Sequence, residues 1–157
     1  MTDRHIIIQK LCFSYENATE PLFDKITVSI HRGWTGIAGP NGCGKTTFLK
    51  LLCGRLSPES GHIDVLPSAR YCEQRTDAMP PSFNELLASH DNSAFRILNT
   101  LGIDPSWASR WDTLSHGERK RVQIADALFG NPALLAVDEP TNHLDNETRA
   151  ILTVALR

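Results

Sequence analysis

One glycine-rich stretch has the spacing G-x-x-x-x-G-K-[ST] of a phosphate-binding loop: Gly39, Pro40, Asn41, Gly42, Cys43, Gly44, Lys45 and Thr46. Glycines let backbone amides curl around phosphate oxygens, and a helix beginning near Lys45 points its positive dipole end at the anion. Lys45 is expected to reach the β- and γ-phosphates and Thr46 to bind Mg²⁺, with Thr47 also at the nucleotide. The alternative is a glycine-rich turn that binds nothing.

Two adjacent carboxylates, Asp138 and Glu139, follow the apolar run Ala133–Val137. An apolar strand in a phosphate-loop protein ends near the bound Mg²⁺, so Asp138 is expected to help hold the metal. Glu139 is the candidate base that orients or deprotonates the attacking water. The alternative is a solvated strand end without chemistry.

The composition indicates a globular chain with a core and excludes several other classes. The 157 residues are 41% hydrophobic and 22% charged, with a formal net charge of −2. That balance gives no overall attraction to nucleic acid or an anionic membrane. The longest apolar run is far shorter than the roughly 20 residues of a membrane-spanning helix, and the start lacks a secretory signal. We therefore expect a cytoplasmic protein without membrane insertion.

The phosphate-binding loop must lie between a strand and a helix. The segment Trp34–Ala38 predicts that strand, and residues 46–52 predict a helix that stops near Gly54. Alternating apolar residues at 6 and 8, and at 26, 28 and 30, predict antiparallel edge strands. Two further strands are expected at His62–Leu66 and Ala69–Glu73.

Helices are expected in the second half of the chain. The Ser-x-x-Glu spacing of a capping box occurs at Ser82 and at Ser115, predicting helices over 83–90 and 119–129. Further helices are expected around 94–101 and from Glu147 onward, and Ala133–Val137 reads as a strand buried on both faces. The pattern predicts an α/β fold, a phosphate-loop NTPase core with an antiparallel β edge subdomain and an inserted α-helical subdomain at about 77–130.

The stretch Leu114-Ser115-His116-Gly117-Glu118 resembles the LSGGQ signature of ATP-binding cassette (ABC) ATPases. This resemblance implies that Ser115 and Gly117 contact the γ-phosphate of ATP held by a second cassette, in a head-to-tail nucleotide sandwich. His116 and Glu118 replace the usual glycine and glutamine. A capped helix alone would also explain Ser115 and Glu118.

Other landmarks of the ABC family occur in order along the chain. The resemblance implies that Tyr15 stacks on adenine. It also implies that Gln74 contacts Mg²⁺ and the attacking water, and links the core to the helical subdomain. Taken singly, Tyr15 reads as a core aromatic and Gln74 as a surface amide. The family's switch histidine is expected beyond Arg157, so the resemblance implies one cassette, incomplete at its C-terminus, within 1–157.

The form TNHLD at Thr141–Asp145 resembles the D-loop of the ABC-F branch, whose members lack a transmembrane domain and carry two cassettes. The branch implies an ATPase that acts on the ribosome in translation or antibiotic resistance. Because the switch histidine is not within 1–157 and only one incomplete cassette is present, we expect the isolated chain to be a weak or inactive ATPase. The basic run Arg119-Lys120-Arg121 is a candidate contact for ribosomal RNA, or else a solvated helix face. The alternatives are the nucleotide-binding subunit of an ABC transporter, with a membrane subunit as partner, and a binding module that does not hydrolyse nucleotide.

Overall fold

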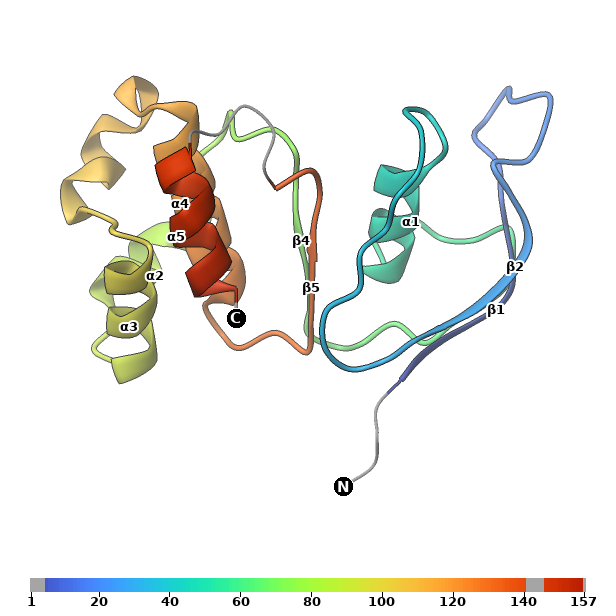
Figure 1. Cartoon of the computed structure of the whole chain (residues 1–157), viewed down its shortest axis with the longest axis horizontal. Coiled ribbons are helices and arrows are strands. Elements are labelled where there is room, and N and C mark those ends of the chain that lie inside the picture. The colour runs from blue at the N-terminus through green and yellow to red at the C-terminus, as the bar shows by residue number, and fades with distance from the viewer. Residues whose placement is uncertain (1–4, 141–145, 157) are drawn as a thin grey trace. The chain divides into compact units, whose positions relative to one another are not determined.

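The computed structural model describes residues 5–140 and 146–156, and Figure 1 labels most of their helices and strands. The D-loop motif at 141–145 and the terminal Arg157 lie outside these residues. The chain forms two compact units, the first ending at Tyr71 and the second beginning at Cys72. Each unit is described by itself below.

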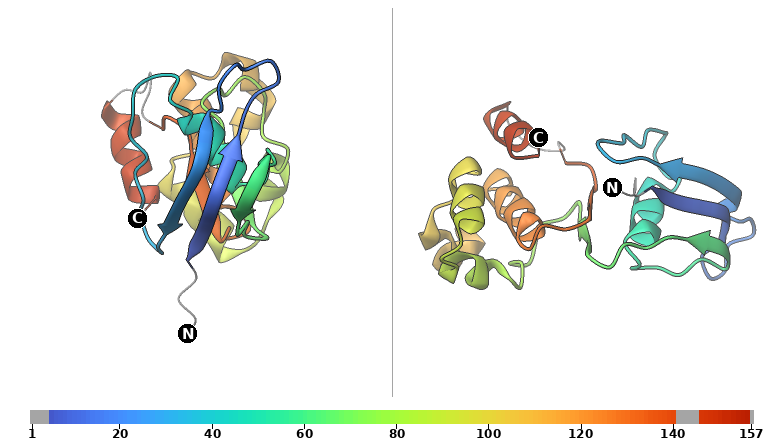
Figure 2. Two further views of the ribbon diagram at one scale, coloured as in Figure 1. Left: turned by 90° about the vertical axis from the view of Figure 1, so that its right-hand side faces the viewer. Right: turned by 90° about the horizontal axis from the view of Figure 1, so that it is seen from below.

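The first unit contains a three-stranded antiparallel sheet in the order β2-β1-β3, which faces the viewer in the left panel of Figure 2. Its strands are β1 (Ile6–Phe13), β2 (Phe23–Ile30) and β3 (Ser60–Ile63). Ile6 lies opposite Ile30 and Ile8 opposite Val28, so the predicted antiparallel edge strands are confirmed.

The buried face of β1 changes register within the strand. Ile6 and Ile8 are buried at its start, whereas Leu11 and Phe13 are buried at its end. Between them Lys10 adopts a φ of 49°, and the pairing with both neighbours shifts there. One extra residue moves the alternation by one position, which keeps both halves of the strand on the core.

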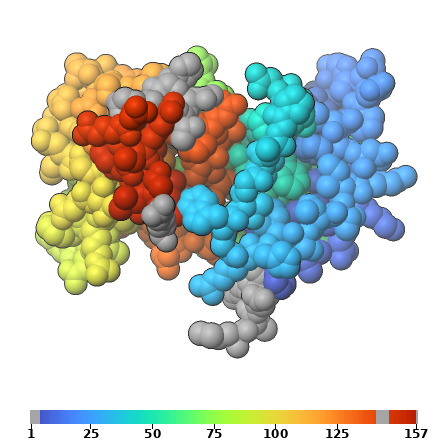
Figure 3. All heavy atoms as spheres, viewed as in Figure 1, coloured from blue at the N-terminus to red at the C-terminus, as the bar shows by residue number. Residues whose placement is uncertain are grey.

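The predicted strand at Trp34–Ala38 is wrong, because this segment has no regular structure and Trp34 is 71% exposed. A strand needs a neighbour to pair its backbone amides and carbonyls, and no ladder to this segment is formed among the described residues. Helix α1 (Lys45–Leu52) follows and ends before Gly54, as predicted. Residues 31–43, light blue to cyan in Figure 3, are exposed.

The strand predicted at His62–Leu66 forms as β3, which begins two residues earlier, at Ser60, and ends at Ile63. Its pairing with β1 starts at Ser60 opposite Cys12, next to Gly61. Gly61 has a φ of +89°, and a Cβ there would overlap the β1 backbone at Lys10. Close backbone approach at a glycine therefore fixes where this strand pairs. The next strand, β4 (Ala69–Cys72), forms close to its predicted position.

The second unit is mainly helical, with α2 (Phe83–Ala88), α3 (Asn92–Thr100), α4 (His116–Leu128) and α5 (Asn146–Ala155). These confirm the predicted helices within a few residues. Its core includes Phe83, Leu101, Trp107, Trp111 and Ile124. A 3-10 helix, η1 (Pro105–Thr113), was not predicted, although Asp104 before Pro105 is a start signal.

Two local predictions in this unit need correction. Ser82 makes no capping bond, because its backbone (φ −90°, ψ 4°) lacks the extended shape that turns an N-cap side chain onto the helix. Strand β5 (Leu134–Val137) forms beside β4 in a two-stranded sheet, but of its residues only Ala136 is fully buried. A strand is buried on both faces only where other elements pack on both faces of its sheet, and the other three residues of β5 stay partly exposed.

The observed elements make an α/β fold with an antiparallel sheet and a group of helices, as predicted. The limits of the helical subdomain, about 77–130, and its place in a single cassette stay predictions. Within residues 5–140 and 146–156, none of the helices combines the length and apolarity that crossing a membrane requires.

Candidate functional site

Gly44, in the glycine-rich loop, is the N-cap residue immediately before α1. Gly44 has a φ of +95°, and a Cβ there would lie 2.8 Å from the Phe23 ring, so two independent constraints require glycine. No side chain caps α1 at this end. An uncapped helix N-terminus at a left-handed glycine presents backbone amides to an anion. The local structure therefore fits a phosphate group.

The Lys45 ammonium lies over the loop itself. Its Nζ donates to the carbonyl oxygens of Gly39 at 3.0 Å and Pro40 at 2.9 Å. Pro40, Asn41, Gly42 and Cys43 are exposed along the same loop. Both bonds of Lys45 go to backbone carbonyls, which are weaker partners for an ammonium than phosphate oxygens. The contact of Lys45 with phosphate stays a prediction.

Tyr15 lies beside the first turn of α1. Its hydroxyl is 2.8 Å from Oγ1 of the buried Thr47, and its ring packs edge-on against Phe13 with centroids 5.1 Å apart. Half of the residue stays exposed, at 51%. The first unit thus brings Tyr15 together with the predicted loop residues, including Thr46 and Thr47. Tyr15 is not a core aromatic, and its contact with adenine stays a prediction.

The second unit brings Glu139 into contact with Gln74 and places the backbone of Asp138 beside Cys72. Asp138 is buried, at 3% exposure, and its amide donates to the Cys72 carbonyl at 3.0 Å. Gln74 Nε2 donates to Glu139 Oε2 at 2.6 Å. Glu139 has a φ of 44°, an uncommon backbone shape for a residue with a side chain. The paired side chains at the ends of β4 and β5 belong to residues 65 positions apart.

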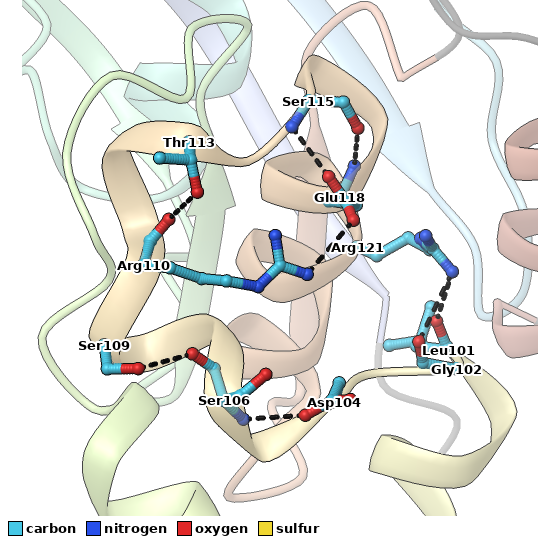
Figure 4. Close-up of polar contacts among 10 residues, drawn as sticks. All are labelled: Leu101, Gly102, Asp104, Ser106, Ser109, Arg110, Thr113, Ser115, Glu118 and Arg121. Carbon is cyan, nitrogen blue, oxygen red and sulfur yellow. Dashed lines mark hydrogen bonds and ion pairs between the residues drawn. The ribbon is translucent and has the colours of Figure 1, made fainter.

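The signature segment begins α4 with a complete capping box, as predicted (Figure 4). The Ser115 amide donates to Glu118 Oε2 at 2.7 Å, and the Glu118 amide donates to Ser115 Oγ at 3.3 Å. The bond from the Ser115 amide, aided by the Arg110 guanidinium, lowers the pKa of the Glu118 carboxyl. The acid therefore stays ionised at the positive end of the helix.

Gly117, the other signature residue, lies against α5. A Cβ at this position would be 2.9 Å from Oγ1 of the buried Thr148. Glycine is therefore required by packing, whatever contact it makes with a nucleotide. Ser115 likewise has a local role as the cap. The roles of both residues toward a second cassette stay predictions.

The basic residues at 119–121 contact other parts of the second unit, and they do not form an exposed basic patch on the surface. Lys120 is 3% exposed. Arg119 donates to the Asp112 carbonyl at 3.0 Å and lies over the Trp111 ring. Arg121 donates to the Leu101 carbonyl at 3.2 Å (Figure 4) and lies over the Trp107 ring. The structure therefore supports neither the basic patch considered for ribosomal RNA nor the alternative of a solvated helix face.

Two polar residues of α4 that contact the Gln74 segment were missed by sequence reasoning. Lys120 Nζ donates to the Glu73 carbonyl at 2.6 Å, and Gln123 Nε2 donates to the Arg75 carbonyl at 3.2 Å. Lys120 and Gln123 are three residues apart, so they lie on one helix face, and this spacing could have indicated that they contact the same partner. The partner segment, however, lies 47 and 48 residues earlier in the chain, and nothing in the sequence identifies it.

Comparison with known protein sequences gives a match to the family model described as ABC transporter, over residues 23–142. An uncharacterised ABC transporter ATP-binding protein of Schizosaccharomyces pombe is 35% identical over 133 residues, covering 78% of this chain and 18% of that protein. The Uup-like ATP-binding protein of Haemophilus influenzae is 36% identical, covering 94% of this chain and 35% of that protein. The chain thus spans only a fifth to a third of these relatives.

A third relative is closer in length. The cell division ATP-binding protein FtsE of Mycobacterium tuberculosis is 29% identical over 174 residues, covering 91% of this chain and 75% of that protein.

Solved structures share the fold at low sequence identity. An ABC transporter ATP-binding protein of Pyrococcus furiosus superposes with a TM-score of 0.71 at 22% identity, covering 98% of this chain and 84% of the other. The cassette MJ0796, in a dimeric post-hydrolysis state with ADP and phosphate, gives 0.73 at 18% identity, covering 96% and 81%. By its sequence match and its fold, the chain belongs to the ABC transporter family and has the phosphate-loop fold of that family's ATPase domain.

Proposed function

We propose that the chain binds Mg²⁺-ATP at the start of α1 and hydrolyses it. The observation that carries this proposal is the uncapped helix N-terminus at the left-handed Gly44, with the Lys45 ammonium over the same loop. Backbone amides and an ammonium are the groups that bind a triphosphate in phosphate-loop proteins. Tyr15 is the candidate for contact with the base.

In this proposal each side chain has one task. Lys45 exchanges the carbonyls of Gly39 and Pro40 for the β- and γ-phosphate oxygens. Glu139 orients the attacking water and accepts its proton while the oxygen bonds to the γ-phosphorus and the bond to ADP breaks. Thr46, Gln74 and Asp138 are the candidate Mg²⁺ ligands. The chemistry that Mg²⁺ supplies when bound is neutralisation of charge on the phosphates.

We further propose that a second cassette completes the site. Ser115 and Gly117 lie at the N-terminus of α4, where a helix dipole and backbone amides favour an anion. An ATP held by a partner cassette would meet this end in a head-to-tail dimer. The dimeric state of MJ0796 supports this arrangement by analogy of fold.

We propose that the protein is of the ABC-F type and acts in the cytoplasm on the ribosome, in translation or antibiotic resistance. The TNHLD sequence at 141–145 is what supports this subtype. The competing function, a nucleotide-binding subunit that docks on a membrane subunit, is supported by the family description and by the name of the Schizosaccharomyces pombe relative.

Phosphate release from ATP by the chain tests the hydrolysis proposal. Glu139→Gln keeps the shape of the side chain and removes the base, so we expect hydrolysis to fall roughly 10²-fold while Mg²⁺-ATP binding persists. Exposed Glu85→Gln, in the first turn of α2, is the matched control and should hydrolyse ATP as the parent does. Equal hydrolysis by Glu139→Gln and the parent would contradict the assignment of the base.

Cosedimentation separates the two candidate functions. We expect Glu139→Gln to accumulate in the ATP-bound state and to sediment with ribosomes in ATP but not in ADP. Equal recovery in ATP, ADP and no nucleotide would contradict an ATP-gated ribosome factor. Recovery with a membrane protein instead of ribosomes would favour the transporter subunit.

A further inference from the structure

The segment that carries Gln74 is held along the length of one helix. Each residue from 72 to 76 other than Gln74 itself has a hydrogen bond to α4. The contacts are Cys72 Sγ to the Gln123 carbonyl at 3.9 Å, Lys120 Nζ to the Glu73 carbonyl at 2.6 Å, Gln123 Nε2 to the Arg75 carbonyl at 3.2 Å, and Thr76 Oγ1 to His116 Nδ1 at 3.4 Å. Gln74 is left to point elsewhere, toward Glu139.

The three side chains of α4 in this set form one stripe. His116, Lys120 and Gln123 are separated by four and then three residues, so they share a helix face. Lys120 and Gln123 hold the carbonyls immediately before and immediately after Gln74. When the backbone is held on both sides of Gln74, mainly its side-chain torsions can still change. Those torsions place Nε2 2.6 Å from Glu139 Oε2, to which it donates a hydrogen bond.

Lys120 is an unusual residue for the place it occupies. It is 3% exposed, and burial lowers the pKa of its ammonium, an effect that the nearby Cys72, Asp138 and Glu73 oppose. Burying an ammonium costs free energy unless it is hydrogen-bonded, and an apolar side chain would fill the space more cheaply. The hydrogen bond from the Lys120 ammonium to the Glu73 carbonyl explains why a lysine occupies this buried position.

We propose that Lys120 and Gln123 are positioning residues that hold Gln74 in contact with Glu139. This inference rests on the proposed function and names what aligns its catalytic pair. Because the same helix begins with Ser115 and Gly117, the two residues also connect the surface proposed to meet a second cassette with the Gln74–Glu139 pair. A displacement of α4 on engagement of that cassette would pass to Gln74 through these two hydrogen bonds.

Backbone exchange tests the positioning independently of activity. Lys120→Met keeps the length and apolar stem but donates no hydrogen bond, so we expect faster amide hydrogen exchange in peptides covering 73–76. Arg121→Met is the matched control, because Arg121 lies on the same helix but bonds to the Leu101 and Gly102 carbonyls (Figure 4). Unchanged exchange at 73–76 in Lys120→Met, or an equal increase in both variants, would overturn the proposal.

Steady-state kinetics test whether this positioning matters for ATP hydrolysis. We expect Lys120→Met to lower kcat for ATP hydrolysis roughly tenfold to a hundredfold, the usual effect of removing a residue that orients a ligand or catalytic group. KM should stay near that of the parent, since the phosphate-binding loop is untouched. Gln123→Leu, which removes one neutral hydrogen bond, should have a smaller effect in the same direction. It serves as the second variant if Lys120→Met does not fold.

A double variant distinguishes positioning from general stability. If Lys120 acts through Gln74, adding Lys120→Met to Gln74→Ala should lower kcat no further. Multiplicative losses in the double variant would overturn the proposal. Absence of phosphate release by the parent itself would refute the proposed hydrolysis, whereas the exchange experiment at 73–76 would still decide whether the two residues hold the segment.

Discussion

Replacing Gly117 by alanine tests whether packing, as well as nucleotide contact, requires glycine in the signature segment. The new Cβ would lie 2.9 Å from Thr148 Oγ1 and 3.6 Å from its Cβ and Cγ2. Thr148 is 4% exposed, so its side chain has little room to move. Overpacking of this kind costs about 1–3 kcal/mol, and the better helix propensity of alanine returns at most about 1 kcal/mol. Subtracting the full propensity gain leaves a net destabilisation of about 0–2 kcal/mol.

A second substitution makes the prediction specific to this contact. Thr148→Ala removes Oγ1 and Cγ2, and the remaining Cβ contact at 3.6 Å is ordinary. In that background Gly117→Ala should be neutral or stabilising by up to about 1 kcal/mol. Urea unfolding of the parent, both single variants and the double variant measures the coupling between the two positions. Equal destabilisation by Gly117→Ala in both backgrounds would refute the packing explanation.

The same four proteins separate packing from nucleotide contact. If the glycine also contacts a partner's ATP, the double variant should recover stability and yet fail to dimerise with ATP. Recovery of both properties would leave Gly117 with a packing role alone.

The remaining predictions concern the cap and charge of α4. Ser115→Ala should destabilise the protein by about 1 kcal/mol, whereas Ser115→Asn keeps a capping oxygen and should stay near the parent in urea unfolding; equal losses would contradict the capping role. Because folding lowers the pKa of Glu118, its contribution to stability is present at neutral pH and is lost as the pH falls below the ordinary glutamate range, through the lowered folded value. The stability difference between the parent and Glu118→Gln should therefore shrink as the pH falls from neutral through that window. A difference independent of pH would contradict this linkage.

Features set by neighbours in sequence could be predicted. The capping box at Ser115 and Glu118 and the start of α1 at Lys45 depend on a few adjacent residues, and both form where their spacing indicates. The box at Ser82 has the same spacing but fails, because the chain entering α2 is not extended there. Spacing alone does not determine that backbone shape.

Features set by distant partners could not be predicted. The segment Trp34–Ala38 has the composition of a strand but no strand pairs with it among the described residues. Lys120 reads as part of a basic surface run, and its burial becomes visible only when the Glu73 carbonyl is found 2.6 Å from its ammonium. Gln74 could be proposed through the family resemblance, and Glu139 from its place at the end of an apolar strand. Their direct contact required the fold.

The central claim, that Mg²⁺-ATP binds at the start of α1, is tested most directly by equilibrium titration of two lysine variants. Lys45→Ala removes the ammonium over the loop, and a charge-assisted hydrogen bond of this kind contributes about 1.5–3 kcal/mol, so we expect affinity to fall by at least about tenfold and to below detection if both phosphate contacts are lost. Lys50→Ala removes a lysine from the same helix that lies 5.9 Å from the Tyr71 ring instead. It should bind Mg²⁺-ATP as the parent does. Equal affinity of Lys45→Ala and the parent would contradict the assignment of the loop.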